Sequence, residues 1–199
     1  MSDATPSSRL DRRAVVARLL ADRGDLLVVV TGLGSPTYDV AAAGDHPRNV
    51  YLWGAMGGTA AMALGLALAR PETPVVVVTG DGEMLMGMGS FATIALQQPK
   101  NLSIVVLDNG LYGETGGQAS HTVRTDLAAV ARACGIADTR RITDMEEVGR
   151  LAGRIGAIGE GPLVAVVAID RAETERVLPT RDGHAIRVRV RQALGLPIG

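Results

Sequence analysis

The sequence predicts an α/β fold with a doubly wound parallel sheet. Short apolar runs rich in valine and isoleucine alternate along the chain with longer segments of helical periodicity. The apolar runs lack polar alternation, as is typical of parallel strands that are buried on both faces. Two of these runs, residues 74–79 and 102–107, flank a helical segment at 90–98, and together they form one βαβ unit.

The other predicted elements continue this alternation. The predicted helices cover residues 10–22, 36–43, 57–69, 126–134 and 144–158, and the further strands cover residues 26–30, 49–53 and 163–169. The polar residues 1–9 are expected to be a disordered lead. We find no repeat or low-complexity linker, so residues 10–199 are expected to form a single domain.

Composition excludes several classes of protein. The 199 residues are 47% hydrophobic, enough for a substantial core, and the formal net charge of −1 gives no electrostatic basis for binding nucleic acid or a membrane surface. Cys134 is the only cysteine, which excludes a disulfide framework or a multi-cysteine metal site within the chain. The N-terminus does not have the pattern of a signal peptide, and the low-polarity stretch 57–69 is too short to span a bilayer. We therefore expect a cytoplasmic protein.

Two loops at the carboxyl ends of the βαβ strands carry the candidate chemistry. Gly-Asp-Gly at 80–82 follows the first strand, and Asp-Asn-Gly at 108–110 follows the second. Ligands of open α/β sheets bind at this edge, so Asp81 and Asn109, 28 positions apart (109 − 81), are expected on one rim. Carboxylate and amide oxygens suit Mg²⁺. Gly-Asp-Gly alone is also common in simple turns, and the second motif favours the metal site.

Together the two motifs resemble the cofactor motif of thiamine diphosphate enzymes. The resemblance implies a thiamine diphosphate-binding fold that uses thiamine diphosphate and Mg²⁺. Carried over by position, it implies that Asp81, Asn109 and the carbonyl oxygen of Leu111 bind the metal. Asp108 stands where the family often has Asn. Glu83 stands where many of its decarboxylases have Ser or Ala, so a carboxylate there would have to point away from the diphosphate.

The expected cofactor-binding positions extend around these ligands. Glycines are useful among them because they turn sharply and their bare N–H groups can approach an anion closely. The full expected set is Gly32, Gly54, Met56, Gly80, Asp81, Gly82, Glu83, Asn109, Leu111, Tyr112 and Gly113.

Met56 and Gly54 are two of three catalytic candidates. From the residues alone, Met56 is an ordinary filler of gaps in the core. The resemblance implies instead that Met56, 24 positions before Gly80 (80 − 56), wedges between the two rings of the cofactor and keeps it bent. The carbonyl of Gly54 matches the acceptor of the 4′-amino group. Such a bend serves an intramolecular proton transfer, which needs the reacting atoms close together.

His121 is the third catalytic candidate. It follows the Gly-Gly-Gln turn at 116–118, in the loop where a substrate would approach the metal rim. An imidazole there either contacts the substrate or transfers a proton, or is only a loop residue, and both alternatives stay open. His46 lies in an Asp-His-Pro turn and is expected to be solvated, and His184 is assigned no role.

The loop at 107–122 is similar to that of sulfopyruvate decarboxylase β subunits and phosphonopyruvate decarboxylases, as are residues 54–57 and 89–95. This resemblance implies decarboxylation of a small 2-oxoacid. Carboligation is an alternative, and so is a non-catalytic cofactor-binding or assembly module. The β subunits of 2-oxoacid:ferredoxin oxidoreductases share the Gly-Gly-Gln loop but rely on cysteine-ligated clusters, and one cysteine argues against them.

The resemblance also implies a partner. Enzymes of this family need a glutamate that pairs with N1′ of the cofactor, and a separate pyrimidine-binding domain supplies it. Since 199 residues hold only one α/β domain, we expect this glutamate to come from another subunit. The alternating arginines at 187–191 fit either a strand edge or a basic helix face. They are either a solvated surface or a contact with an anionic substrate or a partner.

Overall fold

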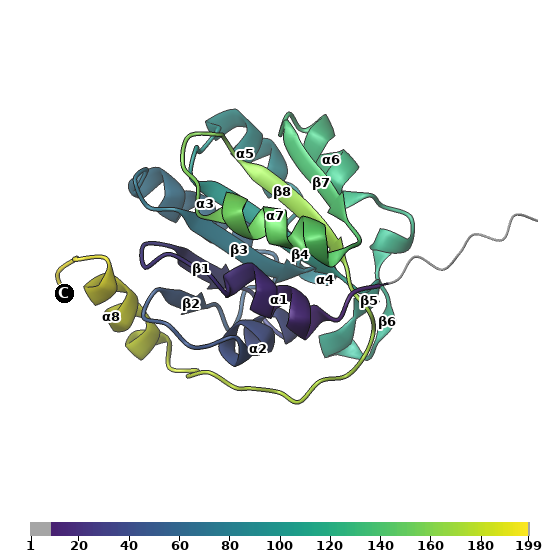
Figure 1. The fold of residues 1–199 in the computed structure, drawn as a ribbon, viewed down its shortest axis with the longest axis horizontal. Coiled ribbons are helices and arrows are strands. Elements are labelled where there is room, and N and C mark those ends of the chain that lie inside the picture. Colours follow the sequence, from purple (N-terminus) through teal and green to yellow (C-terminus); the bar gives the residue numbers. More distant parts are fainter. Residues whose placement is uncertain (1–8, 199) are drawn as a thin grey trace, which may run out of the picture.

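The computed structural model describes residues 9–198, which form a six-stranded parallel sheet with helices on both faces (Figure 1). The strand order is β2-β1-β3-β4-β8-β7, and every neighbouring pair is parallel. The strands are β1 Val28–Thr31, β2 Asn49–Tyr51, β3 Val75–Gly80, β4 Leu102–Asp108, β7 Asp138–Ile142 and β8 Leu163–Ala168. The predicted doubly wound parallel sheet is confirmed.

The helices divide between the two faces according to the direction in which the chain moves along the sheet. Parallel crossovers are right-handed, so a reversal of direction places the connecting helix on the opposite face. One face carries α1 Arg12–Leu20, α2 Ser35–Ala42 and α7 Met145–Ile155 (Figure 1). The other face carries α3 Thr59–Ala69, α5 Ser90–Gln97 and α6 Leu127–Ala133.

The core lies on both sides of the four central strands. All six residues of β3 are apolar, Thr or Gly, and Val75 to Val78 have no exposed surface. Phe91 and Ile94 of α5 are also fully buried. Each such side chain contributes about 1.5–3 kcal/mol through removal from water, which explains why the apolar runs predict these strands well.

Short elements complete the carboxyl edge of the sheet. They are α4 Asp81–Met86, the strands β5 Leu111–Tyr112 and β6 Gln118–Ala119, and the 3-10 turns η1 Gly113–Thr115 and η2 His121–Val123. β5 and β6 pair antiparallel as a small hairpin. The turn expected at 80–82 is instead the beginning of α4, because the chain enters helical geometry directly at Asp81.

Strand β7 is absent from the sequence prediction. It is a polar edge strand, Asp-Thr-Arg-Arg-Ile, in which only Thr139 and Ile142 are buried. An edge strand needs no continuous apolar run, because part of its surface stays in water, so the hydrophobic pattern gives little signal.

The chain after β8 wraps around the molecule. Residues 170–182 run without regular structure past α2 and lead to α8 Gly183–Ala193, which packs beside the edge strand β2 (Figure 1). The arginine-rich stretch 187–191 is therefore part of a helix and not of a strand edge. Arg189 donates to Asp45 Oδ2 at 2.7 Å and to the carbonyl oxygen of Asn49 at 2.9 Å.

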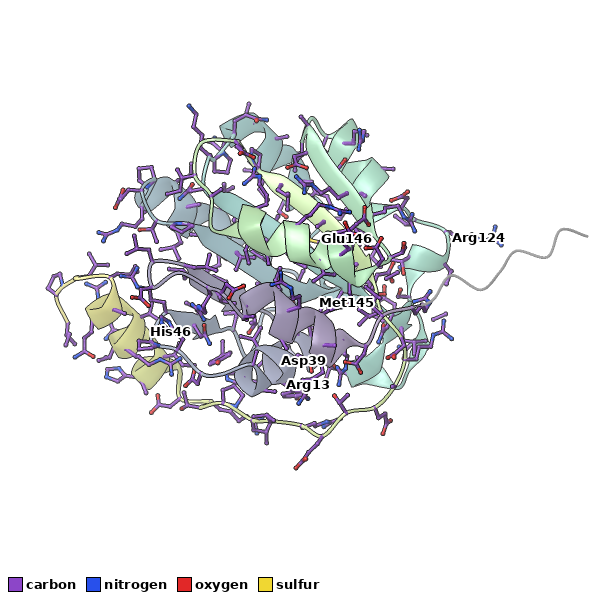
Figure 2. All side chains as sticks on the ribbon, in the orientation of Figure 1. Arg13, Asp39, His46, Arg124, Met145 and Glu146 are labelled. Atoms are coloured by element: carbon purple, nitrogen blue, oxygen red, sulfur yellow. The ribbon has the colours of Figure 1, made fainter. Side chains whose placement is uncertain are left out.

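Two further contacts involve the N-terminal part of the described chain. Arg13 of α1 and the buried Asp39 of α2 lie next to each other, with Nε 2.9 Å from Oδ1 (Figure 2). The lead expected at 1–9 lies outside the described residues except for Arg9, which hydrogen-bonds to the edge of the sheet. Within residues 9–198, no helix is long and apolar enough to cross a membrane.

Candidate cofactor site

A pocket lies at the carboxyl ends of β1, β3 and β4, where the strand order reverses direction between β1 and β3. Open α/β sheets form their ligand crevice at such a point, because successive connections leave toward opposite faces. The loops after β1, β2, β3 and β4 all contribute to its wall. The lining residues are Arg12, Leu33, Ser35, Pro36, Met56, Gly80, Asp81, Gly82, Glu83, Leu107, Asn109, Leu111, Tyr112, Gly113, Glu114, Thr115 and Ile169.

Asp81 is buried at the wall of this pocket with no basic side chain among its hydrogen-bond partners in the described structure. Its Oδ2 accepts hydrogen bonds from the hydroxyls of Ser120 and Thr122. Thr122 Oγ1 also lies 2.9 Å from Asp108 Oδ1, but one hydroxyl proton can serve only one of the two carboxylates. Burial raises the pKa of Asp81, and the nearby charge of Asp108 raises it further, against the hydrogen bond from Ser120.

Asn109 lies in a turn that its own neighbours stabilise. Asn109 Oδ1 accepts from the backbone N–H of Leu111 at 2.9 Å, and Asp108 Oδ1 accepts from that of Gly110 at 3.0 Å. Gly110 has φ +72°, a conformation that glycine adopts without a Cβ penalty. An amide oxygen has two lone pairs, so Asn109 keeps one acceptor position for another ligand.

Glu83 points into the protein between two threonines. Its carboxylate accepts hydrogen bonds from the hydroxyls of Thr59 and Thr79, the second at 2.7 Å. A Cβ on Gly32 would overlap this carboxylate, so the absence of a side chain at residue 32 makes room for Glu83. Gly32 therefore contacts Glu83 and does not line the pocket.

Tyr112 connects the pocket to the exposed loop beyond it. A Cβ on Gly82 would lie 2.6 Å from the Tyr112 ring, so this ring packs directly over the start of α4. The Tyr112 hydroxyl is 3.0 Å from His121 Nδ1, and the two rings meet edge to face at 5.8 Å between centroids. His121 is exposed and lies outside the pocket lining, one side chain away from it.

Comparison with known proteins identifies this arrangement. Residues 34–167 match the family described as thiamine pyrophosphate enzyme, C-terminal TPP binding domain. The chain belongs to this family. Thiamine pyrophosphate is the same compound as thiamine diphosphate.

Relatives and solved structures agree with this assignment. The chain is 44% identical over 134 residues to phosphonopyruvate decarboxylase of Streptomyces hygroscopicus, covering 67% of this chain and 32% of that protein. It is 37% identical over 134 residues to sulfopyruvate decarboxylase subunit beta of Methanocaldococcus jannaschii, covering 67% and 70%. Benzoylformate decarboxylase from Polynucleobacter necessarius shares the fold, with a TM-score of 0.72 at 22% identity over 87% of this chain and 35% of that one. The chain thus spans about a third of the length of the first relative.

Most positions expected to bind thiamine pyrophosphate meet in the pocket. Nine of the eleven line it, namely Met56, Gly80, Asp81, Gly82, Glu83, Asn109, Leu111, Tyr112 and Gly113, whereas Gly32 and Gly54 do not. The catalytic candidate His121 also lies outside the lining. Met56 is half-buried at the pocket wall, so the structure does not place it in the core. Gly54 is exposed, next to Ala55, whose φ of +52° marks a tight backbone bend.

The acidic groups at the rim fit a bound cation. Thr122 Oγ1 lies within hydrogen-bond distance of both Asp81 and Asp108, and the charge of Asp108 raises the pKa of Asp81. Within residues 9–198 no basic side chain forms an ion pair with either carboxylate, so the two repel each other, and a divalent cation beside them would relieve this repulsion. The oxygen donors of Asp81 and Asn109 are of the type that Mg²⁺ prefers.

Sequence reasoning missed several residues that support the site. Ser120 and Thr122 hold Asp81, and Arg12 lines the pocket while it pairs with Asp39. Ser120 and Thr122 flank the candidate His121, which is the only signal that draws attention to them. Nothing in the sequence marks Arg12, because its position beside the pocket depends on how α1 packs against α2.

Proposed function

We propose that this chain is the cofactor-binding, Mg²⁺-holding subunit of a thiamine pyrophosphate-dependent 2-oxoacid decarboxylase. The observation that carries the proposal is the meeting of Met56, Asp81, Asn109 and Leu111 at one pocket from three separate loops. The names of the relatives support a decarboxylase that acts on 2-oxoacids with a second acidic group.

In this proposal Asp81, Asn109 and the carbonyl oxygen of Leu111 hold the metal. The geometry of strand β5 supports the carbonyl oxygen of Leu111 as the third metal ligand. The carbonyls of Gly110 and Tyr112 accept from Ser120 and Gly117, and carbonyls alternate in direction along a strand, so that of Leu111 points away from β6. A metal held there would neutralise charge on the diphosphate, which is the usual role of Mg²⁺ in a site with few protein ligands.

When bound, the cofactor supplies the carbanion chemistry of decarboxylation, and the chain supplies orientation. Met56, at the pocket wall, would press against the cofactor and orient it, and the carbonyl of Gly54 would accept a hydrogen bond from its amino group. Tyr112 and His121 form a hydrogen-bonded pair at the outer side of the pocket, where they contact the substrate or move a proton. Glu83 is held by Thr59 and Thr79 and keeps its charge away from the diphosphate.

The proposal includes a second polypeptide with a pyrimidine-binding domain. The relative from Methanocaldococcus jannaschii is named a subunit beta, and this chain matches 70% of it. The partner contributes the glutamate against N1′ of the cofactor and closes the pocket, since the chemistry needs a site shielded from water.

The test is to compare variants of Asp81 in cofactor binding and in turnover. Asp81→Ala removes a metal ligand, so we expect calorimetry to show loss of Mg²⁺-dependent thiamine pyrophosphate binding. Glu146→Ala is the matched control, because Glu146 is an exposed carboxylate on α7 (Figure 2) and is not among the residues that line the pocket. Unchanged cofactor affinity in the Asp81 variant would rule out the metal assignment.

A reconstitution experiment tests the activity. The chain is purified alone and with a candidate pyrimidine-domain partner, and CO₂ release from sulfopyruvate and phosphonopyruvate is measured with each. We expect activity only in the mixture. Full activity of the isolated chain would contradict the two-subunit proposal, and cofactor binding without activity on any 2-oxoacid would favour an assembly module.

A further inference from the structure

The metal-binding turn at 108–110 is held from outside by two arginines. Arg9 donates to the carbonyl oxygen of Asp108 at 3.2 Å, and Arg171 Nε donates to that of Asn109 at 3.1 Å. The arginines come from opposite ends of the chain. They are brought together by a parallel bridge between Leu10 and Ile169, which extends the sheet beyond β8.

The inner side of the turn depends on local contacts. Asp108 and Asn109 each use a side-chain oxygen to accept from a backbone N–H two residues later. These bonds curl the turn but do not fix its orientation relative to Asp81, the facing ligand at the start of α4. The hydrogen bonds that the outer carbonyl oxygens accept fix this orientation. The carbonyl oxygen of Asp108 accepts from Ile169 N–H at 3.0 Å and that of Gly110 from Ser120 N–H at 2.9 Å.

The carbonyl of Asn109 lies between these two and accepts from Arg171. The guanidinium of Arg171 also packs against Gly110, where an added Cβ would lie 3.4 Å from Arg171 Nη2. Within residues 9–198, the carbonyl oxygens of Asp108 and Gly110 each accept from a backbone N–H, whereas that of Asn109 accepts only from a side chain. The orientation of Asn109 therefore depends on Arg171 more than the orientation of its neighbours does.

We propose that Arg171, assisted by Arg9, is a positioning residue that holds the turn 108–110 so that Asn109 presents its side-chain oxygen to the metal. This inference rests on the proposed metal site. Groups that orient metal ligands from outside typically change metal affinity about 10- to 100-fold when removed. Because Arg171 is exposed and water can replace part of its hydrogen bond, we expect the lower end of this range.

The experiment uses Mn²⁺ as the probe, since it accepts the same oxygen ligands as Mg²⁺ and is visible by electron paramagnetic resonance. The full chain is titrated with Mn²⁺ in the presence of thiamine pyrophosphate. We expect Arg171→Ala to weaken Mn²⁺ binding about tenfold and to change the Mn²⁺ spectrum. Arg171→Lys should recover part of the affinity, because an ammonium group can donate to the same carbonyl.

Arg176→Ala is the matched control. Arg176 lies on the same segment after β8, but its guanidinium stacks 5.7 Å over the ring of Tyr38, away from the turn. We expect this variant to bind Mn²⁺ like the wild type. Wild-type affinity in Arg171→Ala, or equal weakening in Arg176→Ala, would overturn the positioning role. A wild-type chain that binds no Mn²⁺ with the cofactor would instead count against the proposed function itself.

Discussion

The carboxylate of Glu83 fills the space that a side chain on Gly32 would occupy. Gly32 directly follows β1 and Glu83 lies in α4, which follows β3, so their contact joins the segments after two neighbouring strands at the site where the pocket begins. Glu83 cannot easily move aside, because Thr59 and Thr79 both donate to it in a buried environment.

Gly32→Ala is therefore expected to destabilise the protein by about 1–3 kcal/mol, the usual cost of overpacking a buried site. Glu83→Ala in the same chain frees the space, so the double variant should lose less stability than the two single variants together. Denaturant unfolding of the four proteins measures this coupling. Strict additivity would show that the contact is not tight in solution.

The pair Tyr112 and His121 leads to a kinetic prediction. His121→Ala should reduce decarboxylation by the reconstituted enzyme and leave cofactor affinity unchanged, because His121 is outside the pocket lining. A positioned acid or base contributes about 10²–10⁴-fold. Tyr112→Phe should give a smaller loss, since it removes only the hydroxyl that is 3.0 Å from Nδ1. Wild-type turnover of the His121 variant at every pH from 6 to 8 would end the proposal.

The sequence predicts the parts of this protein that depend on continuous burial or on fixed spacing. The valine runs of β3 and β4 predict the central sheet. The βαβ pattern, with Asp81 and Asn109 28 positions apart (109 − 81), suffices to predict that both lie at one edge. Strand β7 escapes prediction because it is polar. The start of α4 is missed because Gly-Asp-Gly indicates a turn equally well.

The supporting groups of the site are predicted least well. Ser120 and Thr122 reach Asp81 across 39 and 41 residues (120 − 81 and 122 − 81), and Arg171 reaches Asn109 across 62 (171 − 109). No local pattern specifies such contacts, since they depend on how the hairpin and the chain after β8 fold back over the sheet edge.

The stability that the contact between Asp45 and Arg189 of α8 contributes should depend on pH. Partial burial raises the pKa of Asp45, but hydrogen bonds from Tyr51 and Arg189 outweigh it and leave the pKa below its ordinary value of 3.8. A carboxylate whose pKa is lowered in the folded state contributes stability above the unfolded pKa and loses it as the pH falls through the folded pKa. The stability difference between wild type and Arg189→Ala should thus be present at pH 6 and diminish below pH 3.8. Equal differences at pH 6 and pH 3 would contradict this.

Met56 gives the prediction that best separates a cofactor contact from ordinary packing. If Met56 holds the cofactor bent, Met56→Ala should lower kcat by about 10² with little change in cofactor affinity, because the bend matters for proton transfer and not for binding. Stability should hardly change, since Met56 is only half-buried.

Met84→Ala is the matched control for this prediction. Met84 lies on α4 with 2% of its surface exposed and packs in the core. Its truncation should cost about 2–5 kcal/mol of stability without a selective effect on kcat. Met56→Leu restores a large aliphatic side chain at the pocket wall, so it should recover most of the turnover. If Met56→Ala loses stability as Met84→Ala does and keeps its kcat, then Met56 is a packing residue and the wedge is absent.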